Sequence, residues 1–358
     1  MEGTFDGLGP ATSLTGILVR LLLLGTVIMT PPGAFAREVA ISAHPSRVRD
    51  PAAYLPAGMN YARVTRSVPV HAELTDIAAN RAFTKHGDDE ARIWVNVLRT
   101  TTVGENRYSF VRWDWGKEGW IPTNALSFTP TFSPLRGVEL EQLGDRRLAM
   151  VFIEQLHVRA APDPFDHSNI LGTIRKYDVV TIHDTRRVGG ADWFMIAPEQ
   201  WIHGGYVRVF SPGRRPEGVG PDEKWIEVNV TKQTAIAHEG DTPVYATLVS
   251  TGRPGRETIT GLFRPWGMFR SAPMRGAAFG LSYDFADVPW IAYFHGSFGW
   301  HGTYWHDKFG TAQSAGCVNM SPFDANWFFE WADPDLPAGR DEIRPTADSP
   351  GTWVYVRR

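Results

Sequence analysis

The chain has 358 residues, which is too long for one ordinary hydrophobic core and indicates two or three domains. Its formal net charge of −3 at pH 7 gives no electrostatic case for binding nucleic acid. The 35 glycines, 26 prolines and 14 tryptophans favour many turns and short strands over long helices, so we expect a mainly β fold.

The N-terminal segment has the pattern of a secretory signal peptide. An apolar run over Ile17–Met29, interrupted only by Arg20, is followed by two prolines and then by Ala34-Phe35-Ala36. A short apolar region with an A-x-A cleavage pattern predicts removal of residues 1–36 and export to the periplasm or cell wall. The run is shorter than the roughly 20 residues that a membrane span needs. An uncleaved anchor is the alternative, because the segment before the run has acidic residues and no basic one.

Two sets of short apolar runs follow an irregular, proline-rich lead-in over residues 37–60. The sets cover residues 61–130 and 147–210, and in both of them apolar and polar residues alternate between glycine-bounded turns. That pattern predicts one small β-barrel per set. The tryptophans of the two sets either fill the barrel cores or line a groove, and we favour the cores. They are Trp113, Trp115, Trp120, Trp193 and Trp201.

The second set resembles bacterial SH3-like domains. The resemblance lies in Leu156–Ala160, in the mid-domain Gly172 and in the closing Gly205-Tyr206-Val207. The first set is a weaker match to the same pattern. In exported bacterial proteins the resemblance implies a domain that binds cell-wall peptides or packs beside a catalytic domain.

A change of composition marks the start of a further domain. Residues 211–223 are rich in proline, glycine and arginine and form a linker by composition. Residues 224–358 then predict a β-rich domain with one helix. The helix begins after Ser321, which serves as the N-cap, with Pro322 at the first position and Asp324 at the third.

Alternation and buried apolar runs predict the strands of this last domain. They are Trp225–Val230, Gln233–His238, Val244–Ser250, Pro289–His295 and Thr352–Val356. Between the third and fourth strands, Arg264–Asp287 is rich in glycine and aromatic residues and is a candidate lid.

Cys317 is the only cysteine of the chain. In an exported protein an unpaired thiol is either intermolecular or chemically useful, and a buried cysteine acting as a small apolar residue is the alternative. His301 lies upstream and is suited to accept the thiol proton. The backbone amides of Gly316 and Cys317, with Ala315, are candidates for holding a negative oxygen. These parts indicate acyl transfer through a thioester.

The residues around this cysteine resemble the signature of the L,D-transpeptidases, a family of bacterial cell-wall enzymes. The signature reads His-Gly-Thr, a spacer, then Ser/Thr-His-Gly-Cys-x-Asn/Arg. This chain has His301-Gly302-Thr303, the spacer, and Ser314 to Asn319. The resemblance covers residues from about Lys224 to Val356.

The resemblance implies a role for each matching position. Cys317 is the acylated nucleophile, His301 the general base, Gly302 the carbonyl that orients the imidazole, and Gly316 a contributor to the oxyanion site. The substrates are peptidoglycan stem peptides, with an amine of a neighbouring stem or of a wall-associated protein as acceptor. Carbapenems are expected to acylate the thiol, and no metal or other cofactor is needed. The remaining positions expected to contact substrate are Thr303, Tyr304, Trp305, Ser314, Ala315 and Asn319.

One position departs from the family pattern, because Ala315 replaces the second histidine of the signature. If that imidazole is needed, activity falls, and His295 and His306 are the candidate substitutes. Three alternatives therefore stay open: a catalytically degenerate scaffold that binds peptidoglycan, a cell-wall cysteine peptidase or L,D-carboxypeptidase, and a zinc site. The zinc reading is disfavoured, since the spacing of the histidines and the cysteine fits no familiar zinc site.

Overall fold

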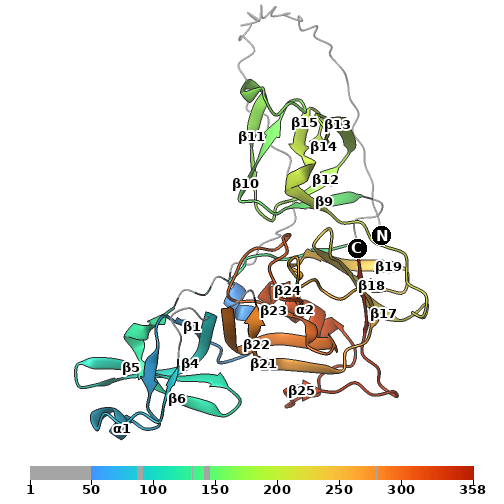
Figure 1. Cartoon of the computed structure of the whole chain (residues 1–358). Coiled ribbons are helices and arrows are strands. Elements are labelled where there is room, and N and C mark those ends of the chain that lie inside the picture. The colour runs from blue at the N-terminus through green and yellow to red at the C-terminus, as the bar shows by residue number, and fades with distance from the viewer. Residues whose placement is uncertain (1–49, 87–91, 129, 131, 141–145, 279–280) are drawn as a thin grey trace, which may run out of the picture. The chain divides into compact units, whose positions relative to one another are not determined.

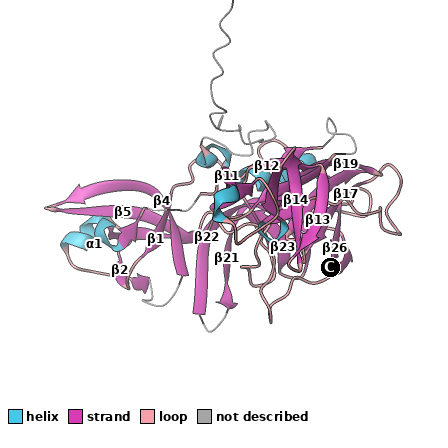
Figure 2. Cartoon of the chain, turned by 90° about the horizontal axis from the view of Figure 1, so that it is seen from above, coloured by secondary structure: helices cyan, strands magenta, loops and turns pink. Residues whose placement is uncertain are grey.

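The computed structural model describes residues 50–86, 92–128, 130, 132–140, 146–278 and 281–358 (Figure 1). The predicted signal peptide and most of the predicted lead-in lie outside these ranges. Within them, no helix is both long and apolar enough to cross a membrane. Strands predominate over helices in the described residues, as the composition predicts (Figure 2).

The last predicted domain begins with an antiparallel meander. β17 (Lys224–Asn229), β18 (Thr234–Glu239) and β19 (Thr242–Leu248) are consecutive neighbours in a six-stranded sheet. Tight turns join them, with Gln233 and Gly240 at positive φ. The strands are buried along most of their length, which explains their nearly continuous apolar sequences. The sheet also contains β8 (Val138–Glu139), β20 (Gly261–Phe263) and β26 (Trp353–Arg357), which runs parallel to β17.

A second, ten-stranded sheet carries the candidate site. Its longest strand, β22 (Leu281–His295), pairs antiparallel with β21 (Gly267–Ala278) and β23 (Phe298–Gly302). β24 (Val318–Met320) runs parallel to β23, and β25 (Glu342–Ile343) pairs with β21. The segment predicted as a lid therefore consists largely of two paired strands. Its glycine and aromatic content predicts a lid, whereas the hydrogen-bonded ladder holds most of the segment in the sheet.

The predicted helix is confirmed as α2 (Pro322–Trp331). The backbone N–H of Asp324 donates to Ser321 Oγ at 3.0 Å, which is the expected N-cap bond, and proline occupies the first turn. The helix packs against β22 and β23 and buries Phe328 in a core shared with Trp300. This core fixes the strands that lead into the candidate site.

Residues 50–128 form a β-rich region whose sheet is continuous with that of the last domain. Its strand β4 (Arg92–Val103) pairs antiparallel with β5 (Asn106–Asp114) and, at its other end, in parallel with β22. No closed barrel is found here among the described residues, so the predicted first barrel is not confirmed. Pairing to β22 covers an edge that a separate domain would leave exposed. The other elements are η1 (Pro51–Tyr54), β1 (Tyr61–Val64), β2 (Val68–Val70), α1 (Leu74–Ala78), β3 (Thr84–His86), β6 (Lys117–Pro122), η2 (Thr123–Ala125) and β7 (Leu126–Ser127).

Residues 146–210 form two antiparallel sheets around a shared core that includes Val151, Val158 and Ile202. The strand orders are β11-β10-β15-β14-β13 and β12-β9-β16. A closed barrel is not found in this part of the described chain either, so the SH3-like assignment stays a prediction. The elements are β9 (Arg147–Val151), β10 (Gln155–Arg159), η3 (His167–Asn169), β11 (Ile170–Arg175), β12 (Val179–Ile182), β13 (Asp184–Val188), β14 (Ala191–Ala197), β15 (Gln200–His203), η4 (Gly204–Tyr206) and β16 (Val207–Val209).

The tryptophans of these two regions mostly fill cores, as we favoured from the sequence. Trp113, Trp120, Trp193 and Trp201 are buried, whereas the Trp115 side chain is 64% exposed. A continuous aromatic groove across the two regions is therefore not formed by these residues.

Candidate active site

A cavity of about 730 Å³ is lined by both Cys317 and His301. Residues from three parts of the chain share its wall: the last domain, the 50–128 region through Arg63, Arg92 and Trp94, and the 146–210 region through Glu154 and Lys176. The cavity is large enough for a segment of peptide.

Strand register brings the thiol and the imidazole to one cavity. In the parallel pair of β23 and β24, Trp300 lies opposite Val318 and His301 opposite Asn319. Cys317 directly precedes β24, two positions before Asn319, so its side chain lies on the same side of the sheet as that of His301. The two residues are sixteen positions apart in the sequence, and the pairing of β23 with β24 brings them to neighbouring strands.

The Cys317 thiol is protonated at neutral pH. Burial raises its pKa to about 11, against the smaller stabilising effect of a hydrogen bond from the Gly299 backbone. Sγ lies 3.6 Å from the Ser297 carbonyl oxygen, to which it donates. In this state the sulfur faces the β23 backbone rather than bonding to the imidazole, so a base must take its proton before the sulfur can act as a strong nucleophile.

The His301 imidazole is buried and neutral at pH 7. Its side chain is only 2% exposed, and burial lowers its pKa to about 4. The Nδ1 atom lies 3.0 Å from the Gly302 carbonyl oxygen, and since a carbonyl only accepts, Nδ1 carries the proton. Nε2 is therefore the basic nitrogen. A side chain at Gly302 would place its Cβ 2.9 Å from Pro289 Cγ, so glycine allows the close packing that fixes this carbonyl.

A tight turn presents Cys317. Ser314 Oγ donates to the Cys317 carbonyl oxygen at 2.6 Å and accepts from the Gly316 amide at 3.0 Å. The Gly316 amide is thus already bonded, which argues against its expected part in holding an oxyanion and leaves the amides of Cys317 and Ala315. Gly316 has φ +134°, and an added Cβ would lie 2.7 Å from Phe298, so the turn requires glycine.

Asn319 and His306 form a second polar pair in the cavity wall. Asn319 Nδ2 lies 2.9 Å from His306 Nε2, and both residues line the cavity. Burial and the neighbouring His301 lower the pKa of His306 to about 3, so this imidazole is also neutral at pH 7. Of the two candidate substitutes for the missing histidine, His306 reaches the cavity. His295 instead packs beside Phe263 and is not among the lining residues.

The three residues after Gly302 lie in different surroundings. Trp305 lines the cavity and stacks on Phe285 with ring centroids 3.9 Å apart. Tyr304 does not line it, so its predicted role in the wall was wrong: its ring is buried, stacks on Tyr61 at 3.6 Å and donates to a backbone carbonyl. Thr303 is also buried away from the cavity, and its hydroxyl has no partner among the described residues. Ala315 and Ser314 both line the cavity.

Sequence reasoning missed a further part of the cavity wall. Tyr283 and Phe285 of β22 and Met274 of β21 line the cavity, together with Arg63 and Arg92. Tyr283 lines the same cavity as Cys317, and burial is the main cause that raises the pKa of this phenol. The sequence carries no signal for this wall, because it depends on pairing between β4 and β22, which are far apart in the chain.

The zinc alternative finds no ligand set in the part of the chain that the structure describes. No group of three or more histidine, cysteine, aspartate or glutamate side chains there is arranged to hold a metal ion. His295, one of the four residues weighed for that site, is not in the cavity that Cys317 lines.

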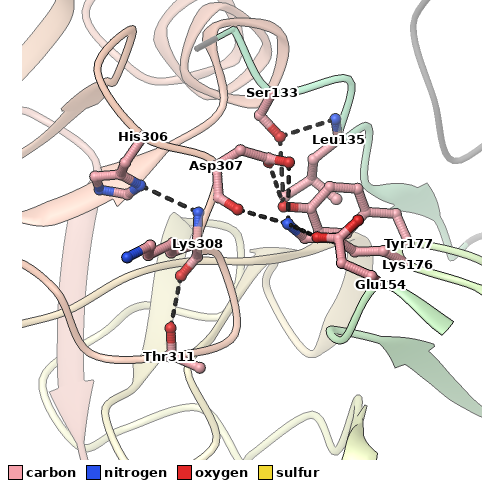
Figure 3. A network of polar contacts seen from close by, with 9 residues as sticks. All are labelled: Ser133, Leu135, Glu154, Lys176, Tyr177, His306, Asp307, Lys308 and Thr311. Carbon is pink, nitrogen blue, oxygen red and sulfur yellow. Dashed lines mark hydrogen bonds and ion pairs between the residues drawn. The ribbon is translucent and has the colours of Figure 1, made fainter. Parts of the chain in front are cut away.

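A polar clamp from the 146–210 region holds the loop that carries His306 and Asp307 (Figure 3). Tyr177 donates to Asp307 Oδ1 at 2.5 Å, and Lys176 Nζ lies 2.6 Å from the Asp307 carbonyl oxygen and 3.0 Å from Oδ2. The phenol is also 3.5 Å from Ser133 Oγ, and Lys176 pairs with Glu154 on its outer side. The clamp joins two regions of the chain at the rim of the cavity.

We expect Asp307→Ala to lower the acylation rate constant of Cys317 by roughly tenfold to a hundredfold, because the loop beside His301 loses its fixed position. The KM for the substrate should change much less. Asp307→Asn should recover part of the rate, because it keeps an acceptor oxygen for the Tyr177 hydroxyl. Single-turnover acylation measured by mass spectrometry checks this. Glu154→Ala is the matched control. It removes only the outer partner of Lys176, and the Glu154 side chain is 84% exposed. An equal loss in Glu154→Ala would contradict the clamp.

Comparison with known proteins agrees with the resemblance seen in the sequence. Residues 223–356 match the model of the YkuD family, described as the L,D-transpeptidase catalytic domain. The chain is 30% identical over 129 residues to YciB of Bacillus subtilis (strain 168), whose own assignment as an L,D-transpeptidase is provisional. That alignment covers 32% of this chain and 65% of YciB.

Solved structures give weaker likenesses. The C442S mutant of Enterococcus faecium L,D-transpeptidase is 20% identical, with 38% of this chain and 50% of that chain covered and a TM-score of 0.30. An L,D-transpeptidase from Mycobacterium smegmatis is 16% identical, with 58% and 93% covered and a TM-score of 0.32. The family match over residues 223–356 confirms the catalytic-domain resemblance.

Proposed function

We propose that this chain is an exported L,D-transpeptidase that passes the acyl group of a peptidoglycan tetrapeptide stem through a thioester on Cys317 to an amine. The observation that carries the proposal is the position of Cys317 and His301 in the wall of one cavity, within the segment that matches the catalytic-domain family. The signal peptide predicted for residues 1–36 supports export. The acceptor is an amine of a neighbouring stem or of a wall-associated protein.

The first half-reaction forms the thioester. His301 Nε2 accepts the Cys317 proton while Sγ attacks the carbonyl carbon that precedes the terminal D-alanine. The new C–S bond moves the carbonyl π electrons onto oxygen, which the amides of Cys317 and Ala315 hold. The C–N bond then breaks, and His301 returns the proton to the departing amine of D-alanine.

The second half-reaction releases the enzyme. The acceptor amine attacks the thioester carbonyl, a new amide bond forms, and the C–S bond breaks. The proton lost by the amine passes through His301 to Sγ, which restores the starting thiol and the neutral imidazole. Each half-reaction balances without a metal or an added cofactor.

The protonation states of the two groups support this division of roles. A thiol with a pKa of about 11 is almost wholly protonated at pH 7, and an imidazole with a pKa of about 4 is neutral and able to accept its proton. A general base is therefore required, and His301 is the buried imidazole whose tautomer leaves Nε2 basic.

Two other functions share the same site. Water in place of the amine would make the chain an L,D-carboxypeptidase or a cysteine peptidase, with the same first half-reaction. Ala315 is the observation that favours a degenerate, peptidoglycan-binding scaffold. Against it, His306 supplies a second neutral imidazole to the cavity, next to Asn319.

Incubation with a carbapenem tests the proposal, with the mass of the intact protein as the readout. We expect one adduct per chain, mapped to Cys317 and absent from Cys317→Ala. A protein that gains no mass yet binds wall sacculi is the scaffold, and this result would overturn the proposal. A peptidase or carboxypeptidase acylates in the same way but releases the acyl group to water, which analysis of muropeptide products detects.

A further inference from the structure

Part of the cavity wall is built by residues that strand pairing places in two rows. Arg63 of β1 lies opposite Trp94 of β4, and Trp94 lies opposite Phe285 of β22. In the next row, Arg92 of β4 lies opposite Tyr283 of β22. Residues directly opposite each other, and residues two apart on one strand, share a face of the sheet. All five therefore face the same way, and all five line the cavity.

The junction between β4 and β22 is held by hydrogen bonds, so this wall has a fixed geometry. Asn96 Nδ2 donates to Asp287 Oδ2 at 2.9 Å, and Tyr61 donates to the Asp287 carbonyl oxygen at 2.6 Å. An ion pair also joins the strands next to these two, because Arg275 Nη1 of β21 lies 2.8 Å from Asp114 Oδ2 of β5. The side chains of Arg63 and Arg92 are thus presented by a bonded sheet rather than by a loop.

Neither Arg63 nor Arg92 has a hydrogen-bond or carboxylate partner among the described residues, although both are exposed to the cavity. The diagonal position of the two residues on adjacent strands places their α-carbons about 7–8 Å apart. The acidic residues of the cavity wall, Glu154 and Asp307, are both paired with Lys176. The guanidinium groups of Arg63 and Arg92 therefore face a cavity in which Lys176 already neutralises the carboxylates of the wall.

We propose that Arg63 and Arg92 form a carboxylate-binding subsite for the peptide substrate, contributed by the 50–128 region to the catalytic cavity. The inference rests on the proposed function for the identity of the peptide. A guanidinium binds a carboxylate through paired N–H donors, and aromatic rings beside it, here Trp94 and Phe285, suit the aliphatic part of a peptide side chain. Peptidoglycan stems carry several carboxylates, and this subsite selects stems in which one of them is free rather than amidated.

The carboxylate belongs either to the donor stem or to the acceptor stem, and the two half-reactions separate these sources. Acylation of Cys317 is measured with a donor tetrapeptide in its free and its amidated form. Transfer is measured from a preformed acyl-enzyme to an acceptor tripeptide in the same two forms. The variants are Arg63→Ala, Arg92→Ala and the double variant. Arg107→Ala is the matched control, because Arg107 is exposed on β5 of the same region and does not line the cavity.

In the double variant we expect KM for the free-carboxylate peptide to rise about 10- to 100-fold in one of the two half-reactions, with the maximal rate within about twofold of wild type. The amidated peptide and the Arg107→Ala control should show no such change, and Arg→Lys at both positions should recover part of the affinity. Equal effects on free and amidated peptides, or no effect in either half-reaction, would overturn the subsite.

A binding measurement keeps this inference separate from the proposed chemistry. The same peptides are titrated into Cys317→Ala, with and without the two arginine substitutions, and tryptophan fluorescence reports binding beside Trp94 and Trp305. The subsite predicts that the arginine substitutions weaken binding of the free-carboxylate peptide alone. If wild-type protein forms no thioester but this difference is present, the proposed function fails and the subsite stands. If thioester forms and the difference is missing, only the subsite fails.

Discussion

Replacing His301 with alanine is expected to lower the rate of Cys317 acylation at pH 7 by about 10²–10⁴-fold. The thiol has a pKa of about 11, so without a base only a small fraction of the protein carries the reactive thiolate. In the proposed mechanism, His301 removes this limit by accepting the proton during attack. Stopped reactions with a tetrapeptide or a carbapenem, read by intact mass, give the two rate constants.

The pH profile distinguishes a base from a structural residue. A base acts in its neutral form, so if His301 is the base, the wild-type rate should fall as the pH drops through its lowered pKa of about 4 and should be level from about pH 6 to pH 9. In His301→Ala the rate should instead rise about tenfold per pH unit up to the thiol pKa of about 11.

His295→Ala is the matched control for this experiment. His295 packs beside Phe263 and Phe298 and is not among the cavity-lining residues, so its removal should leave both the rate and the pH profile unchanged. A level profile in His301→Ala, parallel to wild type, would remove His301 from the role of base.

Replacing Asp324 with alanine is expected to lower the free energy of unfolding by about 3–5 kcal/mol. This carboxylate is fully buried and accepts four hydrogen bonds. Oδ1 accepts from the Gly137 amide at 2.8 Å and the Tyr245 hydroxyl at 2.7 Å, and Oδ2 accepts from the hydroxyls of Thr247 and Ser321 at 2.6 and 2.9 Å. Alanine leaves these buried donors unpaired.

The effect also depends on pH, with a sign set by the raised pKa of Asp324, of which burial is the main cause. A pKa that is higher in the folded state than in the unfolded state gives stability that is fully present below the ordinary value of 3.8 and is lost as the pH rises through the raised pKa. The difference between wild type and Asp324→Ala should therefore be largest in acid. Urea denaturation at several pH values measures it, with the exposed Asp348→Ala as the control. A loss below 1 kcal/mol would contradict the account of this network.

The local elements were predictable because their signals lie in neighbouring residues. The meander from Trp225 was predicted from alternation and tight turns, and the helix after Ser321 from its N-cap and its proline. The structure confirms the strands and the cap. Most of Arg264–Asp287, the segment predicted as a lid, lies in the paired strands β21 and β22, because glycine content does not reveal strand pairing. The same limit hid the parallel pairing of β4 with β22, which joins the first region to the catalytic sheet.

The site divides in a similar way. The motif spacing identified Cys317 and His301, which line one cavity, and Trp305 beside them. It misplaced Tyr304, which is fully buried and does not line the cavity, whereas Trp305 beside it does. Arg63 carries no motif, and its place in the wall follows only from strand register.

The central claim is that Cys317 attacks the amide bond before the terminal D-alanine of a stem peptide, forms a thioester with the rest of the stem and releases D-alanine. Its most direct test is incubation of the wild-type protein with a tetrapeptide ending in D-alanine, followed by the mass of the intact protein and by quantification of free D-alanine. The account predicts one acyl group on Cys317 for each D-alanine released in the first turnover, and neither product with Cys317→Ala. Release of D-alanine by Cys317→Ala at the wild-type rate, or no acyl group on a wild-type protein that binds the peptide, would contradict it.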